Sequence, residues 1–164
     1  MITDEQFIIN GLAGKKTLEG KINTPGAKNA VLKVLAASIL FSDEVTISNV
    51  PDIEDVARML ELLEDLGVVV EKQDSKTYRL ITSEILTHEI STEISKHLRA
   101  SIVLTGPLLG RLGKVTFPHP GGCVIGKRPI DFFIEGFKIL GADVKDVGSG
   151  YENKVKKNLE GNTI

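Results

Sequence analysis

The first half of the chain holds a long apolar run that predicts a buried helix. From 29 to 40 nearly every residue is apolar, and Lys33 is the exception. A helix with no polar face belongs in a domain interior, so Lys33 must snorkel or face a cleft. A second apolar run covers 102–109. We expect 30–40 and 102–109 to form the most buried helices of the fold.

A different spacing predicts an amphipathic helix from Ile53 to Leu66. Its apolar positions recur every three or four residues and fall on one face: Ile53, Val56, Leu60, Leu63 and Leu66. Asp52 suits the N-cap, and Gly67 suits the residue that stops the helix.

Short β-rich runs predict strands around these helices. One lies at 45–47, and the runs 68–72 and 78–82 predict a hairpin turning at 73–75. A weak alternation over 15–22 predicts a further strand, which Gly20 breaks or bulges.

The second half of the chain repeats this order. A cation (Lys28, then Arg99) opens an apolar helix, and a short strand follows at 45–47 and at 115–117. An amphipathic helix then ends in Leu-Gly at 66–67 and at 140–141, before a further strand. The pattern predicts an α/β fold with one unit at about 15–83 and another at about 84–152. Residues 153–164 would then be the start of a third unit or a tail.

The second copy carries extra residues between its strand and its amphipathic helix, and these hold the lone cysteine, Cys123. A loop added to one copy of a repeat favours function, because the other copy folds without it. Lys127 and Arg128 lie close in sequence and would favour a reactive thiolate. The alternative is an inert cysteine in a mobile hairpin tip. His119 could polarise Cys123, although an ordinary exposed loop histidine is the favoured interpretation.

Lys28, Arg99 and Arg128 each precede or open a predicted helix. Free backbone N–H groups at such ends bind anions, so three cations there indicate a site for an anionic ligand. Asp131, in the first turn of the third helix, could contact substrate or simply stabilise the helix end. His88, His97 and His119 have no metal-ligand spacing with Cys123, so we predict no metal site.

Composition narrows the class of protein. The 164 residues are 41% hydrophobic and 26% charged, as in a soluble globular domain. A net charge of −2 argues against a nucleic-acid partner. No apolar run is long enough for a membrane span, and the N-terminus is acidic rather than basic. We therefore expect a cytoplasmic protein that binds no membrane.

Five segments carry a resemblance to a known family. Pro120-Gly121-Gly122-Cys123-x-Ile125-Gly126-x-Arg128-Pro129-x-Asp131 resembles the active-site loop of UDP-N-acetylglucosamine enolpyruvyl transferases (1-carboxyvinyltransferases). Four more segments follow that family's order: Gly26-Ala27-Lys28-Asn29-Ala30, Asn49-Val50-Pro51-x-Ile53-x-Asp55-Val56, Arg99-Ala100-Ser101-Ile102 and Gly106-Pro107-Leu108-Leu109. The likeness spans about 20–151. The shikimate-pathway enolpyruvyl transferase shares the architecture, but its loop is less similar.

The resemblance implies a fold and a reaction. Family members have two domains, each an inverse α/β barrel of three βαβαββ-type units, with the active site between the domains. This chain resembles about two units of the N-terminal domain, so a second domain is expected as its partner. The implied substrates are phosphoenolpyruvate and UDP-N-acetylglucosamine, whose 3′-hydroxyl receives the enolpyruvyl group. No cofactor is implied.

The resemblance also implies residue roles. Cys123 would be the acid that protonates C3 of phosphoenolpyruvate, a covalent attachment point and the target of fosfomycin. The substrate-binding residues would be Lys28, Asn29, Arg99, Arg128, Pro129, Ile130, Asp131 and Phe132. The base and another phosphate-binding arginine belong to the family's second domain and cannot be placed on this sequence.

Other functions stay open at this point. The chain could be a truncated relative that binds a sugar nucleotide or a partner without turnover, or part of a 3-phosphoshikimate 1-carboxyvinyltransferase-like enzyme. An inert structural domain is the weakest interpretation, because it leaves five ordered motifs unexplained. We expect the chain alone to turn over little substrate.

Overall fold

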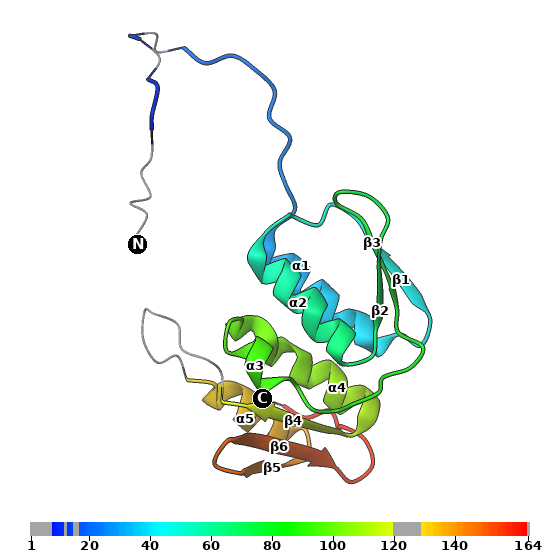
Figure 1. Cartoon of the computed structure of the whole chain (residues 1–164). Coiled ribbons are helices and arrows are strands. Elements are labelled where there is room, and N and C mark those ends of the chain that lie inside the picture. The colour runs from blue at the N-terminus through cyan, green and yellow to red at the C-terminus, as the bar shows by residue number, and fades with distance from the viewer. Residues whose placement is uncertain (1–7, 12, 15–16, 120–128, 164) are drawn as a thin grey trace, which may run out of the picture.

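The helices of the protein lie packed together between two small antiparallel sheets (Figure 1). This computed structural model describes residues 8–11, 13–14, 17–119 and 129–163. Within that part of the chain no helix is long and apolar enough to cross a membrane. The α/β class predicted from the sequence is confirmed.

The first unit contains two helices and one sheet. Helix α1 (Lys28–Ala37) continues as a 3₁₀ turn, η1 (Ser38–Leu40). The sheet is formed by β1 (Glu44–Ile47), β2 (Val69–Lys72) and β3 (Tyr78–Ile81). Helix α2 (Glu54–Asp65) connects β1 to β2 along the chain. The strand order is β1-β3-β2, which confirms the predicted hairpin.

The second unit repeats this arrangement. Its helices are α3 (Thr92–Ser95), η2 (Arg99–Leu104), α4 (Thr105–Leu112) and α5 (Asp131–Ile139). Its strands are β4 (Lys114–Pro118), β5 (Ala142–Asp146) and β6 (Gly150–Val155), in the order β4-β6-β5. The polar sequence of β6 concealed this strand from the pattern analysis.

The strand registers of the two units correspond residue by residue. Val45 pairs with Leu80 in the first sheet, and Val115 pairs with Asn153 in the second. Both amphipathic helices also stop at a glycine with positive φ, 102° at Gly67 and 91° at Gly141. The internal repeat predicted from the sequence is therefore present in three dimensions.

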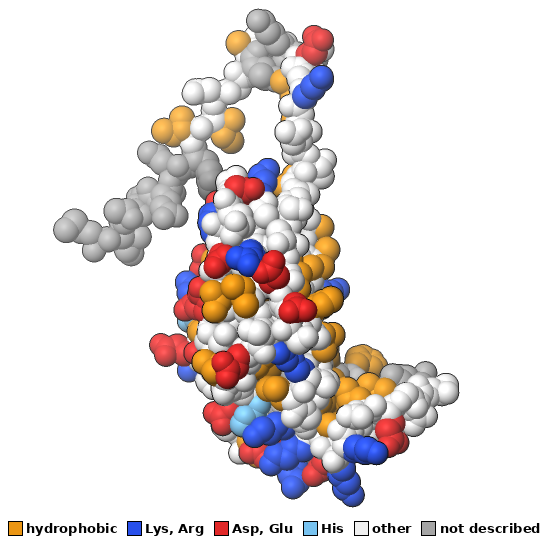
Figure 2. All heavy atoms as spheres, turned by 90° about the vertical axis from the view of Figure 1, so that its right-hand side faces the viewer, with side chains coloured by type: hydrophobic (Ala, Val, Ile, Leu, Met, Phe, Trp, Pro, Cys, Tyr) orange, Lys and Arg blue, Asp and Glu red, His pale blue; other side chains and the backbone are white. Residues whose placement is uncertain are grey.

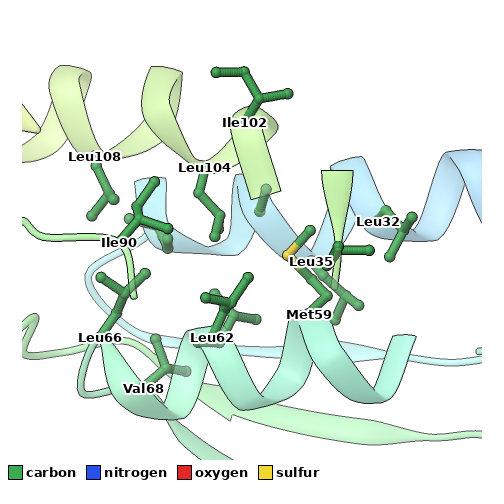
Figure 3. Packing of buried hydrophobic residues seen from close by; sticks show 14 of the residues in the cluster. Leu32, Leu35, Met59, Leu62, Leu66, Val68, Ile90, Ile102, Leu104 and Leu108 are labelled. Carbon is green, nitrogen blue, oxygen red and sulfur yellow. The ribbon is translucent and has the colours of Figure 1, made fainter. Parts of the chain in front are cut away.

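Each helix buries the face that its apolar spacing predicts. Leu35 of α1, Met59 and Leu62 of α2, and Leu104 and Leu108 from η2 and α4 are fully buried and point into one shared cluster (Figure 3). Burying a side chain of this size contributes about 1.5–3 kcal/mol. One continuous core thus joins the two units.

A side chain also ties the units together across their boundary. Arg111 of α4 donates to the backbone carbonyls of Ile39 (2.7 Å) and Phe41 (2.6 Å), at the end of η1. Its other terminal nitrogen donates to the carbonyl of Ser83 at 3.1 Å. The rigid guanidinium fork suits this role, because it offers several donors in one plane.

Four details differ from the sequence prediction. Residues 30–40 are buried at six of eleven positions, as expected for one of the most buried segments, but they keep an exposed face, where Val34 of α1 and Leu40 of η1 are 48% and 58% exposed. The buried face of α1 meets α2 and η2. Residues 102–109 are all buried or half-buried, but their first part is 3₁₀ rather than α-helical.

The other two differences concern segment ends. Helix α2 begins at Glu54 with Ile53 as its N-cap, so Asp52 does not cap it. Residues 17–25, which include most of the strand expected at 15–22, run as exposed chain away from the body (Figure 1). A strand needs a hydrogen-bonded neighbour, and none of the described strands pairs with this segment. Residues 15 and 16 lie outside the described part.

Candidate anion-binding site at the N-terminus of α1

The N-terminus of α1 has the features of an anion site. The helix starts at Lys28 after an uncapped Ala27, whose carbonyl accepts the N–H groups of Ala30 and Val31. Its first turn holds no carboxylate, so nothing from the helix itself neutralises its positive end. The side chains of Lys28 and Asn29 project from this end.

A close backbone contact fixes the approach to the helix. A Cβ at Gly26 would lie 1.9 Å from the carbonyl oxygen of Asn49, so only glycine fits. Asn49 itself has φ 57°, a left-handed conformation that asparagine tolerates. Two of the motifs quoted above, 26–30 and 49–56, therefore meet in space.

An ion pair joins the same two motifs. The ammonium of Lys28 lies 2.7 Å from Oδ2 of Asp55, in the first turn of α2. The side chains are 53% and 35% exposed, so both are accessible to a ligand. The sequence analysis did not predict this contact, although Asp55 is one of its motif residues.

The second unit supplies the other side of the site. An open pocket of about 420 Å³ is lined by Lys28, Asn29 and Asp55 from the first unit and by Lys96, His97 and Arg99 from the second, among others. Arg99 opens η2, a 3₁₀ helix of six residues, so the expected α-helical N-terminus is absent there. Three cations face one carboxylate in this pocket, which favours an anionic ligand.

The pocket brings together three of the residues predicted from the sequence, Lys28, Asn29 and Arg99. Lys96 was missed, although it stands three residues before Arg99. His97 was considered only as a metal ligand, and among the described residues no three His, Cys, Asp or Glu side chains gather as a metal site would need.

The α5 segment is separate from the residues that line this pocket. Pro129 is exposed, Ile130 is buried in the core, and Asp131 is exposed in the first turn of α5. Phe132 is 85% exposed, which leaves its ring free to meet a ligand or another protein surface. Cys123 and Arg128 lie outside the described residues, so their predicted roles remain predictions.

His119 is the last described residue before 129, where the described chain resumes ahead of α5. Its Nε2 is 3.7 Å from Oδ1 of Asp146, and its ring lies edge-on to Tyr151 with centroids 4.9 Å apart. Its backbone N–H donates to the Ser149 carbonyl at 3.3 Å. The side chain is half exposed and anchors the end of β4 to the β5–β6 turn.

The chain is similar to known proteins in sequence and in fold. The sequence profile of the family described as EPSP synthase (3-phosphoshikimate 1-carboxyvinyltransferase) matches residues 12–164. Similar curated proteins are named UDP-N-acetylglucosamine 1-carboxyvinyltransferase. Those of Symbiobacterium thermophilum and Wolinella succinogenes are both 39% identical, over 98% and 93% of this chain. The chain spans only 37% and 36% of their lengths.

Solved structures agree on the fold. The enolpyruvyl transferase NikO from Streptomyces tendae superposes with a TM-score of 0.73 at 19% identity, covering 87% of this chain and 31% of NikO. The EPSP synthase of Acinetobacter baumannii gives a TM-score of 0.60 at 18% identity, over 87% of this chain and 33% of that one. At such low identity the likeness supports the fold alone.

Proposed function

The chain belongs to the EPSP synthase (3-phosphoshikimate 1-carboxyvinyltransferase) family, and on that premise we propose that it forms part of an enolpyruvyl transferase. The reaction would join the enolpyruvyl group of phosphoenolpyruvate to the 3′-hydroxyl of UDP-N-acetylglucosamine. This would be the first committed step of peptidoglycan precursor synthesis, in the cytoplasm. The curated relatives' names support this substrate pair over 3-phosphoshikimate.

The observation that carries the proposal is the meeting of Lys28, Asn29 and Arg99 in one open pocket. The reaction brings two anionic substrates together, so it needs cations where negative charge gathers. We assign Lys28 and Asn29 to phosphoenolpyruvate and the sugar nucleotide, and Arg99 to the nucleotide. Arg fits phosphate well, because its planar fork binds two oxygens at once.

The remaining roles rest on the family resemblance. Arg128 would share the charge-offsetting role of Lys28, and Pro129, Ile130, Asp131 and Phe132 would line the nucleotide pocket. Cys123 would donate the proton that C3 accepts when the hydroxyl adds to C2, before phosphate leaves. The base and a further phosphate-binding arginine would come from a second domain, which we propose as the partner of this one.

Ligand titration by calorimetry tests the pocket. Lys28→Ala and Arg99→Ala should each weaken UDP-N-acetylglucosamine binding about tenfold, which corresponds to about 1.4 kcal/mol. Lys33→Ala is the matched control, because Lys33 is an exposed lysine on the same helix and does not line the pocket. Equal affinity of all three variants would contradict the assignment. Tighter binding of shikimate 3-phosphate than of the sugar nucleotide would favour the other substrate class.

A phosphate-release assay with both substrates tests the need for a second domain. We expect the chain alone to show no significant turnover, because it supplies no candidate for the base. Turnover at the rate of a typical enzyme, about 10 s⁻¹, would show that the chain contains the missing group after all.

A further inference from the structure

The start of α2 holds three acidic residues, and only one of them reaches the pocket. Glu54 binds Arg58 within its own helix, with Oε1 2.8 Å from the guanidinium. Asp52 precedes the N-cap and is exposed. Asp55 instead crosses to α1 and meets the Lys28 ammonium at 2.7 Å.

The two helix ends explain why this contact forms. Lys28 stands at the positive end of α1, where the helix dipole repels an ammonium group. Asp55 stands at the positive end of α2, where the same effect holds a carboxylate in place. Without Asp55, the dipole of α1 would drive the flexible Lys28 side chain out towards solvent.

Exposure of the pair argues that its purpose is orientation rather than stability. Both side chains are partly open to water, at 53% and 35%, and ion pairs of this kind add little to folding stability. An ammonium group has three N–H donors, so Lys28 can keep one on Asp55 and offer the others to an oxyanion in the pocket.

We propose that Asp55 is a positioning residue, which holds the Lys28 ammonium at the pocket so that it is already placed for the phosphate of phosphoenolpyruvate. This inference rests on the proposed function, because it concerns the same anion site. It assigns to the 49–56 motif a role that acts through Lys28. Pre-placement raises affinity because less side-chain freedom is lost when the ligand binds.

A double-mutant cycle tests the coupling. Phosphoenolpyruvate binding is measured on the wild-type chain, Asp55→Asn, Lys28→Ala and the double variant. Asp55→Asn should weaken binding about three- to fivefold. The same change should have no effect when Lys28 is already alanine, because Asp55 acts only through Lys28. Asp52→Asn is the matched control and should bind like wild type.

Two outcomes would overturn the inference. If Asp55→Asn binds phosphoenolpyruvate as tightly as wild type or more tightly, Asp55 competes with the ligand or is irrelevant to it. If the loss persists in the Lys28→Ala background, Asp55 acts by another route. Thermal unfolding of each variant by circular dichroism separates these results from a loss of fold.

A ligand-free measurement separates this inference from the proposed function. If the wild-type chain bound neither substrate, the proposed function would be contradicted, but the positioning of Lys28 by Asp55 would not. NMR relaxation of the Lys28 side chain reports its restraint without any ligand. Asp55→Asn should make that side chain as mobile as Lys33, whereas Asp52→Asn should leave it restrained. Equal Lys28 mobility in wild type and Asp55→Asn would defeat the positioning role itself.

Discussion

The two sheets have the same register but different residues at the centre of the middle strand. In the first unit Leu80 of β3 lies between Val45 and Val70, and it is fully buried. In the second unit Asn153 of β6 occupies the same place, between Val115 and Val144, and is equally buried. Neither amide atom of Asn153 has a hydrogen-bond partner among the described residues. One register therefore tolerates an apolar and a polar centre.

The two sheets also differ in the charged residues that pair across neighbouring strands. Arg79 of β3 binds Glu71 on one neighbouring strand (3.0 Å) and Glu44 on the other, and these carboxylates raise its pKa, with Glu44 contributing most. At the matching pair of the second sheet the signs are reversed, with Lys145 opposite Glu152. Figure 2 shows Lys and Arg side chains gathered at the lower end of the molecule, where β5 and β6 lie. The register therefore does not depend on particular surface charges.

Exchanging the central residues should have the largest effect. Leu80→Asn should lower the free energy of unfolding by about 3–5 kcal/mol, because it removes core packing and buries an unpaired amide. Asn153→Leu should raise the free energy of unfolding by about 1–2 kcal/mol, because it removes a buried amide that has no hydrogen-bond partner among the described residues. Urea unfolding followed by circular dichroism measures both. A destabilised Asn153→Leu variant would indicate that the amide has a partner, such as a buried water.

The next largest effect concerns the residue that comes just before or opens the middle strand, Thr77 in the first unit and Gly150 in the second. Gly150 pairs with Pro118, and a Cβ there would lie 2.2 Å from the Phe117 carbonyl oxygen. Thr77, at the matching position of the first unit, carries a side chain without difficulty. Gly150→Ala should cost about 2–3 kcal/mol in unfolding free energy, because backbone atoms must move. Thr77→Ala should cost under about 1 kcal/mol. Similar losses in the two variants would mean that the units tolerate side chains equally at this turn.

Much of the fold could be predicted because helices and strands leave different periodicities. The repeat, both Leu-Gly helix stops and the first hairpin are all confirmed. Predictions failed where an element depends on its neighbours rather than on its own sequence. Residues 17–22, the described part of the strand expected at 15–22, pair with no described strand. The apolar helix from Lys28 keeps an exposed face, and polar residues hid β6.

The site was predictable to a different extent. Lys28 and Arg99 stood out as cations that open helices, and the structure places them in one pocket. The Lys28–Asp55 contact spans 27 positions and depends on how α1 packs against α2. Sequence spacing carries no direct signal of such a contact, since it exists only after the two helices have packed.

The smallest effect concerns the acceptors in the two hairpin turns. Asp74 Oδ1 accepts the Lys76 backbone N–H at 2.7 Å, and Asp146 Oδ1 accepts the Gly148 N–H at 2.8 Å. The Lys76 N–H is the largest cause of a lowered pKa at Asp74, and the Thr77 side chain adds to it. The ionised carboxylate is therefore favoured in the folded chain.

A lowered folded pKa fixes the sign of the pH dependence. The stability that Asp74 contributes is fully present above the ordinary aspartate pKa of about 4 and is lost as the pH falls through the lowered folded value. Asp74→Asn keeps an acceptor oxygen but does not titrate, so its unfolding free energy should fall less than that of wild type over this acidic range. Carboxyl ¹³C NMR titration measures the pKa directly. If Asp74 titrates at or above the ordinary value, the Lys76 N–H does not hold its carboxylate in solution, and the predicted pH dependence is wrong.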